Sequence, residues 1–167
     1  MRTICLLAFA LVAGSCGGSL SDEQRRKLHE GLEEQKIVRL SDSEIVTSSL
    51  ERGRKIYQEM QRRGFRPEAI DSIESQYRVN IRLITPGSAG ALEVENQLIE
   101  AYVVAAETGS VPDNIQKLPL IADPKKYHSL LYTRPKVTPL PDGAVKVEGI
   151  WNIYLSKKDV ILSLDQK

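Results

Sequence analysis

Cysteine is scarce in this chain, with two among 167 residues, at positions 5 and 16. Because Cys5 lies inside an apolar N-terminal segment, Cys16 is the only cysteine available to the rest of the chain, and no disulfide is expected within it. The same scarcity excludes a thiolate metal site, an iron–sulfur cluster and a cysteine nucleophile. We expect a domain that holds no metal and no cofactor.

Long apolar runs and excess positive charge are also missing. The stretch from Ile4 to Val12 is far shorter than the roughly 20 apolar residues that cross a bilayer. Lys and Arg number 23 and Asp and Glu number 22, so little charge is left to neutralise phosphates and nucleic acid is not expected as a partner. The chain lacks the motifs of a serine hydrolase elbow and of a phosphate loop, and we expect no enzymatic activity.

The N-terminus is informative in what it does contain. Arg2, the apolar run and the small residues after it have the layout of a secretory signal peptide. Cys16 follows these small residues and is itself followed by two glycines, which looks like a bacterial lipoprotein signal, although Ala13 stands where leucine is usual. We predict a signal peptide over residues 1–15 and a lipid on Cys16. The alternative is ordinary cleavage that leaves a free thiol.

A lipid on Cys16 would attach the protein to a membrane without crossing it. We therefore expect an exported protein anchored in the bacterial envelope, on the periplasmic side or at the cell surface. Residues 16–21 would form the lipidated cysteine and a short tether. Residues 22–40 would form a charged helical stalk, and residues 41–167 an α+β domain.

Two capping boxes predict two helices in the first part of the chain. Ser21 with Gln24 begins a highly charged helix over residues 22–36. Ser41 with Glu44 begins a better amphipathic helix, closed by two arginines and a glycine. One face of the second helix carries Ile45, Ser49, Gly53, Ile56 and Met60.

The remaining pattern predicts three strands and two helices. Residues 77–84 alternate as a half-buried strand, with Tyr77, Val79, Ile81 and Leu83 on one side. A helix follows from residue 91 to near 109, with Leu92, Glu95, Leu98, Tyr102 and Ala106 along one face. Residues 110–127 are predicted as a long connection. Strands over 129–137 and 144–156 and a last helix over 157–164, capped by Ser156, complete an α+β fold with a small antiparallel sheet and helices on one side.

The last two strands form a hairpin in which Asp142-Gly143 is a favoured two-residue turn. That register places Arg134 opposite Trp151, and it predicts a cation–π contact between the two. It also places Thr138 opposite Val147, and it puts Val145, Val147, Trp151, Ile153 and Leu155 on one apolar face. Tyr132, Arg134 and Trp151 are the candidate ligand-binding residues. Plain core packing edged by an arginine is the other interpretation.

Three stretches resemble a known family: IRLITPGSAGALEVENQLIEAY, LLYTRP and VEGIWNIYLSKKDVI. Across residues 37–164 the chain is similar to bacterial PAS-like domains that bind c-type haem, found as exported single domains and as modules of sensor kinases. The resemblance implies a PAS-like fold and a sensory or binding role. Members carry Cys-x-x-Cys-His between the two final strands, and residues 136–149 contain neither residue here, so covalent haem is excluded.

Three functions remain open on the sequence alone. The first is a lipid-anchored, non-enzymatic domain that binds a small ligand or an envelope protein partner. The second is an accessory redox or electron-transfer protein that holds a cofactor without a covalent bond. The third is a structural envelope protein in which the charged helix 22–36 docks a partner.

Overall fold

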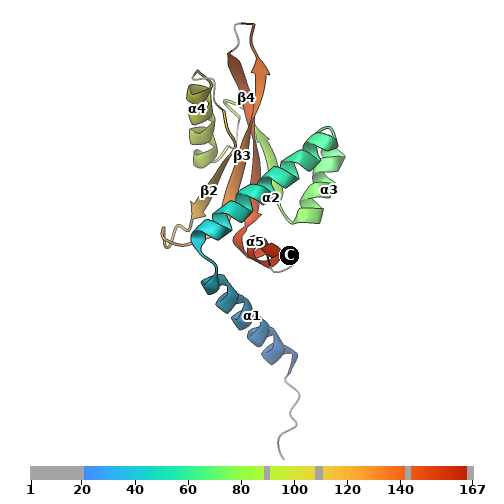
Figure 1. Ribbon diagram of the computed structural model, residues 1–167, viewed down its shortest axis with the longest axis vertical. Coiled ribbons are helices and arrows are strands. Elements are labelled where there is room, and N and C mark those ends of the chain that lie inside the picture. Colours follow the sequence, from blue (N-terminus) through green and yellow to red (C-terminus); the bar gives the residue numbers. More distant parts are fainter. Residues whose placement is uncertain (1–20, 89–90, 108–110, 142–143, 165–167) are drawn as a thin grey trace, which may run out of the picture. The chain divides into compact units, whose positions relative to one another are not determined.

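The computed structural model describes residues 21–88, 91–107, 111–141 and 144–164 (Figure 1). The chain divides into two compact units, 1–39 and 40–167, and each is considered by itself. The first unit contains helix α1 (Asp22–Arg39). Its predicted capping box is confirmed, because Gln24 N donates to Ser21 Oγ at 3.3 Å and Ser21 N donates to Gln24 Oε1 at 3.0 Å. The signal peptide and Cys16 lie outside the described residues.

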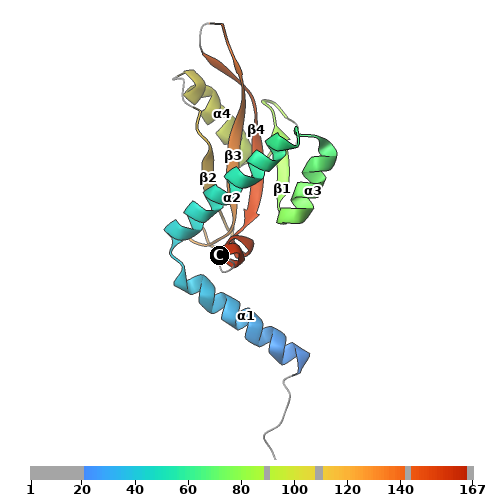
Figure 2. The same cartoon turned by 45° about the vertical axis from the view of Figure 1, so that its right-hand side comes forward.

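The second unit is an α+β domain built on a four-stranded antiparallel sheet (Figures 1 and 2). The sheet order is β1-β4-β3-β2. The elements in chain order are α2 (Asp42–Arg62), α3 (Pro67–Tyr77), β1 (Asn80–Ile84), α4 (Glu93–Glu107), β2 (Asn114–Pro119), β3 (Tyr127–Pro139), β4 (Val145–Ser156) and α5 (Lys157–Leu164). The predicted class and the small antiparallel sheet are confirmed.

Helix α2 forms as the sequence predicts. Glu44 N donates to Ser41 Oγ at 3.3 Å and Ser41 N donates to Glu44 Oε2 at 2.9 Å, which satisfies two amides of the first turn. The five positions predicted on one face are the five buried positions of the helix. A periodicity of 3.6 residues is therefore enough to define this buried face.

Helices cover both faces of the sheet, so the prediction that they lie on one side is wrong. Gly53 of α2 lies against Tyr132 of β3, whereas α4 packs on the neighbouring Leu131 and on Ile150 of β4. Successive residues of a strand point to opposite faces, so α2 and α4 lie on opposite sides of the sheet. α3 and α5 pack beside α2. Figure 2 shows α2 in front of the strands and α4 behind them.

Two elements differ from the prediction. Residues 67–77 form α3, which includes Tyr77, and β1 is limited to residues 80–84. Pro67 at the first helical position and Glu68 beside it favour this helix start. Residues 114–119, predicted as part of a long connection, form the edge strand β2. An edge strand tolerates the proline that ends it, because one side of its backbone has no ladder to complete.

The β3–β4 pairing places Arg134 opposite Trp151, as predicted. The predicted turn at Asp142-Gly143 lies outside the described residues. Next to it, Leu140 N donates to Ala144 O at 2.8 Å.

Nearer the turn the predicted register is wrong by one residue. Thr138 pairs with Lys146 instead of Val147, because the register shifts after Lys136 and leaves Glu148 without a partner in the ladder. Such a bulge moves the side chains beyond it to the other face of the sheet. Val147 is therefore buried in the cluster under α4, and Val145 packs partly buried against that cluster. The predicted single apolar face breaks at this point.

Candidate functional site

The three residues predicted to bind a ligand lie on the α2 face of the sheet but differ in exposure. Tyr132 is 1% exposed and Trp151 is 9% exposed, whereas the side chain of Arg134 is 44% exposed. Leu83 of β1 pairs with Trp151, so these side chains form one row across the sheet. Of this row, only Arg134 and Leu83 are exposed enough to contact a ligand directly.

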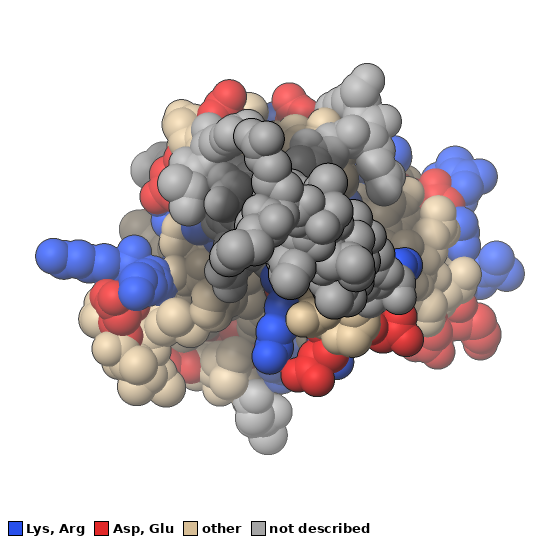
Figure 3. Space-filling model, turned by 90° about the horizontal axis from the view of Figure 1, so that it is seen from below, with Lys and Arg blue, Asp and Glu red and all other residues tan. Residues whose placement is uncertain are grey.

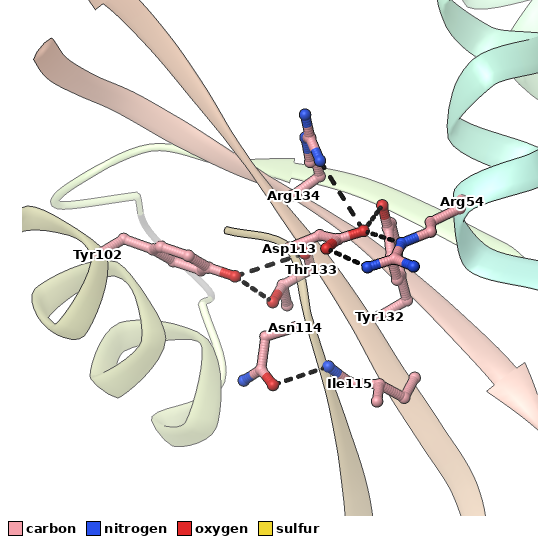
Figure 4. A network of polar contacts seen from close by, with 8 residues as sticks. All are labelled: Arg54, Tyr102, Asp113, Asn114, Ile115, Tyr132, Thr133 and Arg134. Atoms are coloured by element: carbon pink, nitrogen blue, oxygen red, sulfur yellow. Dashed lines mark hydrogen bonds and ion pairs between the residues drawn. The ribbon is translucent and has the colours of Figure 1, made fainter. Parts of the chain in front are cut away.

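Asp113, just before β2, holds the polar part of this row together (Figure 4). Arg54 of α2 donates to both of its carboxylate oxygens, from Nε at 2.7 Å and from Nη2 at 2.9 Å. Tyr132 donates its hydroxyl to Oδ2 at 3.1 Å, and Nη1 of Arg134 lies 3.8 Å from the same oxygen. Helix α2 and strand β3 are therefore both tied to one carboxylate, just before β2, whose side chain is only 6% exposed.

The electrostatics fix the charges of this group. Hydrogen bonds from Arg54 lower the pKa of Asp113 below its usual value, and they outweigh burial, which acts in the opposite direction. Burial raises the pKa of Tyr132, and the nearby charge of Asp113 raises it further. Asp113 is thus ionised and Tyr132 neutral at physiological pH. Neither group is suited to exchange a proton with a substrate near neutrality.

Arg134 is held in place by two neighbours and still exposes its donors. Its guanidinium carbon lies 5.6 Å from the centroid of the Tyr57 ring, a distance that gives a cation–π contact. The predicted cation–π contact with Trp151 is wrong, although the two residues are opposite each other. Among the described residues, Arg134 makes no side-chain hydrogen bond, and its contacts are the long ion pair with Asp113 and the Tyr57 ring.

Trp151 stacks on Phe65 instead. The two ring centroids are 5.3 Å apart with an interplanar angle of 17°, and Phe65 also contacts Tyr57 at 5.7 Å. Phe65 adopts a φ of 54°, a left-handed conformation that is rare for a bulky residue. The turn between α2 and α3 therefore places an aromatic ring over Trp151 at a conformational cost.

Two hollows described on the second unit lie away from these residues. One, of about 370 Å³, is lined by the turn at Pro86 and by α4. The other, of about 310 Å³, lies between the start of α2 and the end of α5. Neither is lined by Tyr132, Arg134 or Trp151, so neither hollow belongs to the candidate site.

A second buried carboxylate, Glu95, is structural. Its side chain is 0% exposed. It accepts hydrogen bonds from Leu92 N at 2.7 Å, Asn152 Nδ2 at 3.0 Å and the Tyr154 hydroxyl at 2.7 Å. It also forms an ion pair with Arg82, whose Nη1 lies 3.3 Å from Glu95 Oε2. Burial raises its pKa, but these hydrogen bonds outweigh burial and leave the pKa below its usual value. Glu95 thus anchors the start of α4 to the sheet and has no accessible oxygen to offer.

The sequence analysis missed four residues of the site: Arg54, Tyr57, Phe65 and Asp113. Arg54 and Asp113 are 59 positions apart, and no local pattern connects them. The role of Asp113 as a bridge between α2 and β3 depends entirely on the tertiary fold.

Comparisons with protein-family models, with curated proteins and with solved structures find no match for this chain. Within the described ranges, no helix is long and apolar enough to cross a membrane. The same part of the chain contains no group of three or more His, Cys, Asp or Glu side chains that could hold a metal ion.

Proposed function

We propose that this protein is a lipid-anchored, non-enzymatic binding protein of the bacterial envelope, with a haem-less, PAS-like sensory domain. The observation that carries the binding role is Arg134. Its guanidinium is oriented by Tyr57 and Asp113, is about half exposed, and donates no side-chain hydrogen bond to the described residues. An oriented arginine with free donors is a common means of recognition.

The anchoring part of the proposal rests on the N-terminal sequence. The test is mass spectrometry of the intact protein purified in detergent from a bacterial host. We expect a chain that begins at Cys16 and carries the added mass of acyl chains. Cys16→Ser should abolish that added mass. The matched variant Cys5→Ser removes the other cysteine, inside the predicted signal peptide, and should leave it unchanged. An unmodified Cys16 in the native protein would refute the anchor.

The same measurement tests the binding role. A small molecule retained through purification would appear as a second mass under native conditions, and its loss in Arg134→Ala would connect it with this site. A visible absorption band in the pure protein would contradict the proposal and favour the redox function, because aromatic side chains absorb only in the ultraviolet.

A further inference from the structure

The surface around Arg134 is open, aromatic and positively charged. We define the arginine–aromatic surface as Arg54, Tyr57, Phe65, Leu83 and Arg134, with Trp151 beneath it. We propose that this surface binds an acidic peptide segment of a protein partner. The inference rests on the binding role proposed above and specifies the chemistry of the partner.

Charge complementarity is the first argument. Six of the residues from 52 to 66 are Lys or Arg, and Glu59 is the only acidic residue among them. The Glu59 carboxylate already forms ion pairs with two of these arginines, from its Oε1 to Arg62 Nη2 at 2.5 Å and to Arg63 Nε at 2.6 Å. On the opposite face of the sheet, α4 contains four Glu and no Lys or Arg, and one of these, Glu95, is buried. Helix α3, which packs beside α2, carries three acidic residues and no Lys or Arg, so the positive charge of this face is confined to the end of α2 and the turn after it, around Tyr57 and Phe65, where it favours carboxylates.

The site already shows how it holds a carboxylate. Arg54 binds both oxygens of Asp113 in the bidentate geometry that guanidinium and carboxylate groups favour. Asp113 already accepts three hydrogen bonds, from Arg54 and from Tyr132, and Arg134 lies 3.8 Å away as an ion pair without a hydrogen bond. A second carboxylate, from outside the chain, can take the exposed side of the Arg134 guanidinium.

The apolar neighbours favour a peptide over a free ion. Phe65 and Tyr57 are half-buried, and Leu83, in the same row as Trp151, is 39% exposed. Trp, Tyr and Arg side chains are the residues that most often dominate the energetics of protein interfaces. A peptide with acidic residues around an apolar or aromatic one would match both parts of the surface.

The burial of the aromatic rings argues against a lipid bilayer as the occupant. Tyr57 and Phe65 are half-buried, whereas insertion into a bilayer needs apolar side chains that reach past the headgroups. The fully exposed Ile121 belongs to the loop between β2 and β3 and not to this surface. Among the side chains that Figure 3 draws in colour, Lys and Arg lie next to Asp and Glu in several places.

The test uses the purified full chain and a fluorescein-labelled peptide of glutamates with one central phenylalanine, followed by anisotropy. The control peptide has lysine in place of each glutamate. We expect the acidic peptide to bind and the basic one not to bind. Arg134→Ala should weaken binding by about tenfold or more, and Arg134→Lys by less, because it keeps the charge but loses the planar fork. Arg26→Ala, with a side chain 73% exposed on α1, should bind like the native chain.

Four results would overturn the proposal. The first is that the acidic peptide does not bind. The second is that Arg134→Ala binds the peptide as tightly as the native chain, and the third is that Arg26→Ala weakens binding as much as Arg134→Ala, which would indicate unspecific charge attraction. The fourth is a different occupant, shown by Arg134-dependent binding to phosphatidylglycerol vesicles without peptide binding or by Arg134-dependent self-association in sedimentation. Since none of these results changes the mass carried by Cys16, failure of this inference is distinguishable from failure of the anchor.

Discussion

Gly53 is where α2 lies closest to the sheet, and replacing it with alanine tests the packing that positions the site. A Cβ added at Gly53 would overlap the ring of Tyr132 and come within 2.8 Å of the Tyr132 Cβ. Tyr132 is 1% exposed and its hydroxyl is bonded to Asp113, so the ring has no room to turn away. The helix itself would have to move off the sheet.

Two opposing effects set the magnitude. In an unobstructed helix, Gly→Ala stabilises a protein by about 1 kcal/mol. Overpacking a buried site costs about 1–3 kcal/mol and occasionally more, and the upper end applies here because the Tyr132 Cβ cannot rotate aside. We expect Gly53→Ala to lower the free energy of unfolding by about 2 kcal/mol. The melting temperature should fall by roughly 4–8 °C.

The assay is urea denaturation followed by circular dichroism and by the fluorescence of the single tryptophan, Trp151. The matched control is Gln58→Ala, an exposed position on the same helix, where we expect a gain of a few tenths of a kcal/mol. If Gly53→Ala is as stable as the native chain or more stable, while the control behaves as expected, the close packing of α2 on Tyr132 is wrong.

Two further predictions concern the buried carboxylates. Glu95→Ala should lower the free energy of unfolding by about 3 kcal/mol, because it leaves the buried donors of Leu92, Asn152 and Tyr154 without their acceptor. A loss below about 1 kcal/mol in urea denaturation would contradict the anchoring role. The lowered pKa of Asp113 means that its ion pair with Arg54 stabilises the fold above the ordinary aspartate pKa of about 4, and that this stability is lost as the pH falls through the lowered value. Asp113→Asn should therefore be less stable at neutral pH and lose less on acidification, and parallel acid profiles of variant and native chain would speak against this ion pair.

The sequence prediction was most accurate for features that depend on residues close together in the chain. The capping box of Ser41 and Glu44 and the five buried positions of α2 follow from hydrogen bonds and a periodicity within a few turns. The face of α4 was predicted nearly as well, except that Ile99 is buried and Leu92 lies before the helix, 49% exposed. The β2 edge strand was missed because prolines and polar residues outweighed its short alternation.

The hairpin shows where a local argument stops being sufficient. The opposition of Arg134 and Trp151 followed from counting back from a turn, and the structure has it. The side-chain partner of Arg134 did not follow, because Tyr57 comes from a helix far away in the sequence. A single bulge near Glu148 then moved Val147 to the other face, which no alternation pattern could indicate.

The sequence by itself determined the starts of α1, α2 and α5, the buried face of α2, the antiparallel hairpin and the lack of cysteine after Cys16, since each depends on composition or on residues close together in the chain. The tertiary structure alone decided that helices cover both faces of the sheet and that Asp113 joins Arg54, Tyr132 and Arg134. The contacts of Asp113 join residues up to 59 positions apart, and such pairs form only when packing brings their elements together. The residues of the arginine–aromatic surface can be read in the sequence, but only the fold brings them together at Arg134.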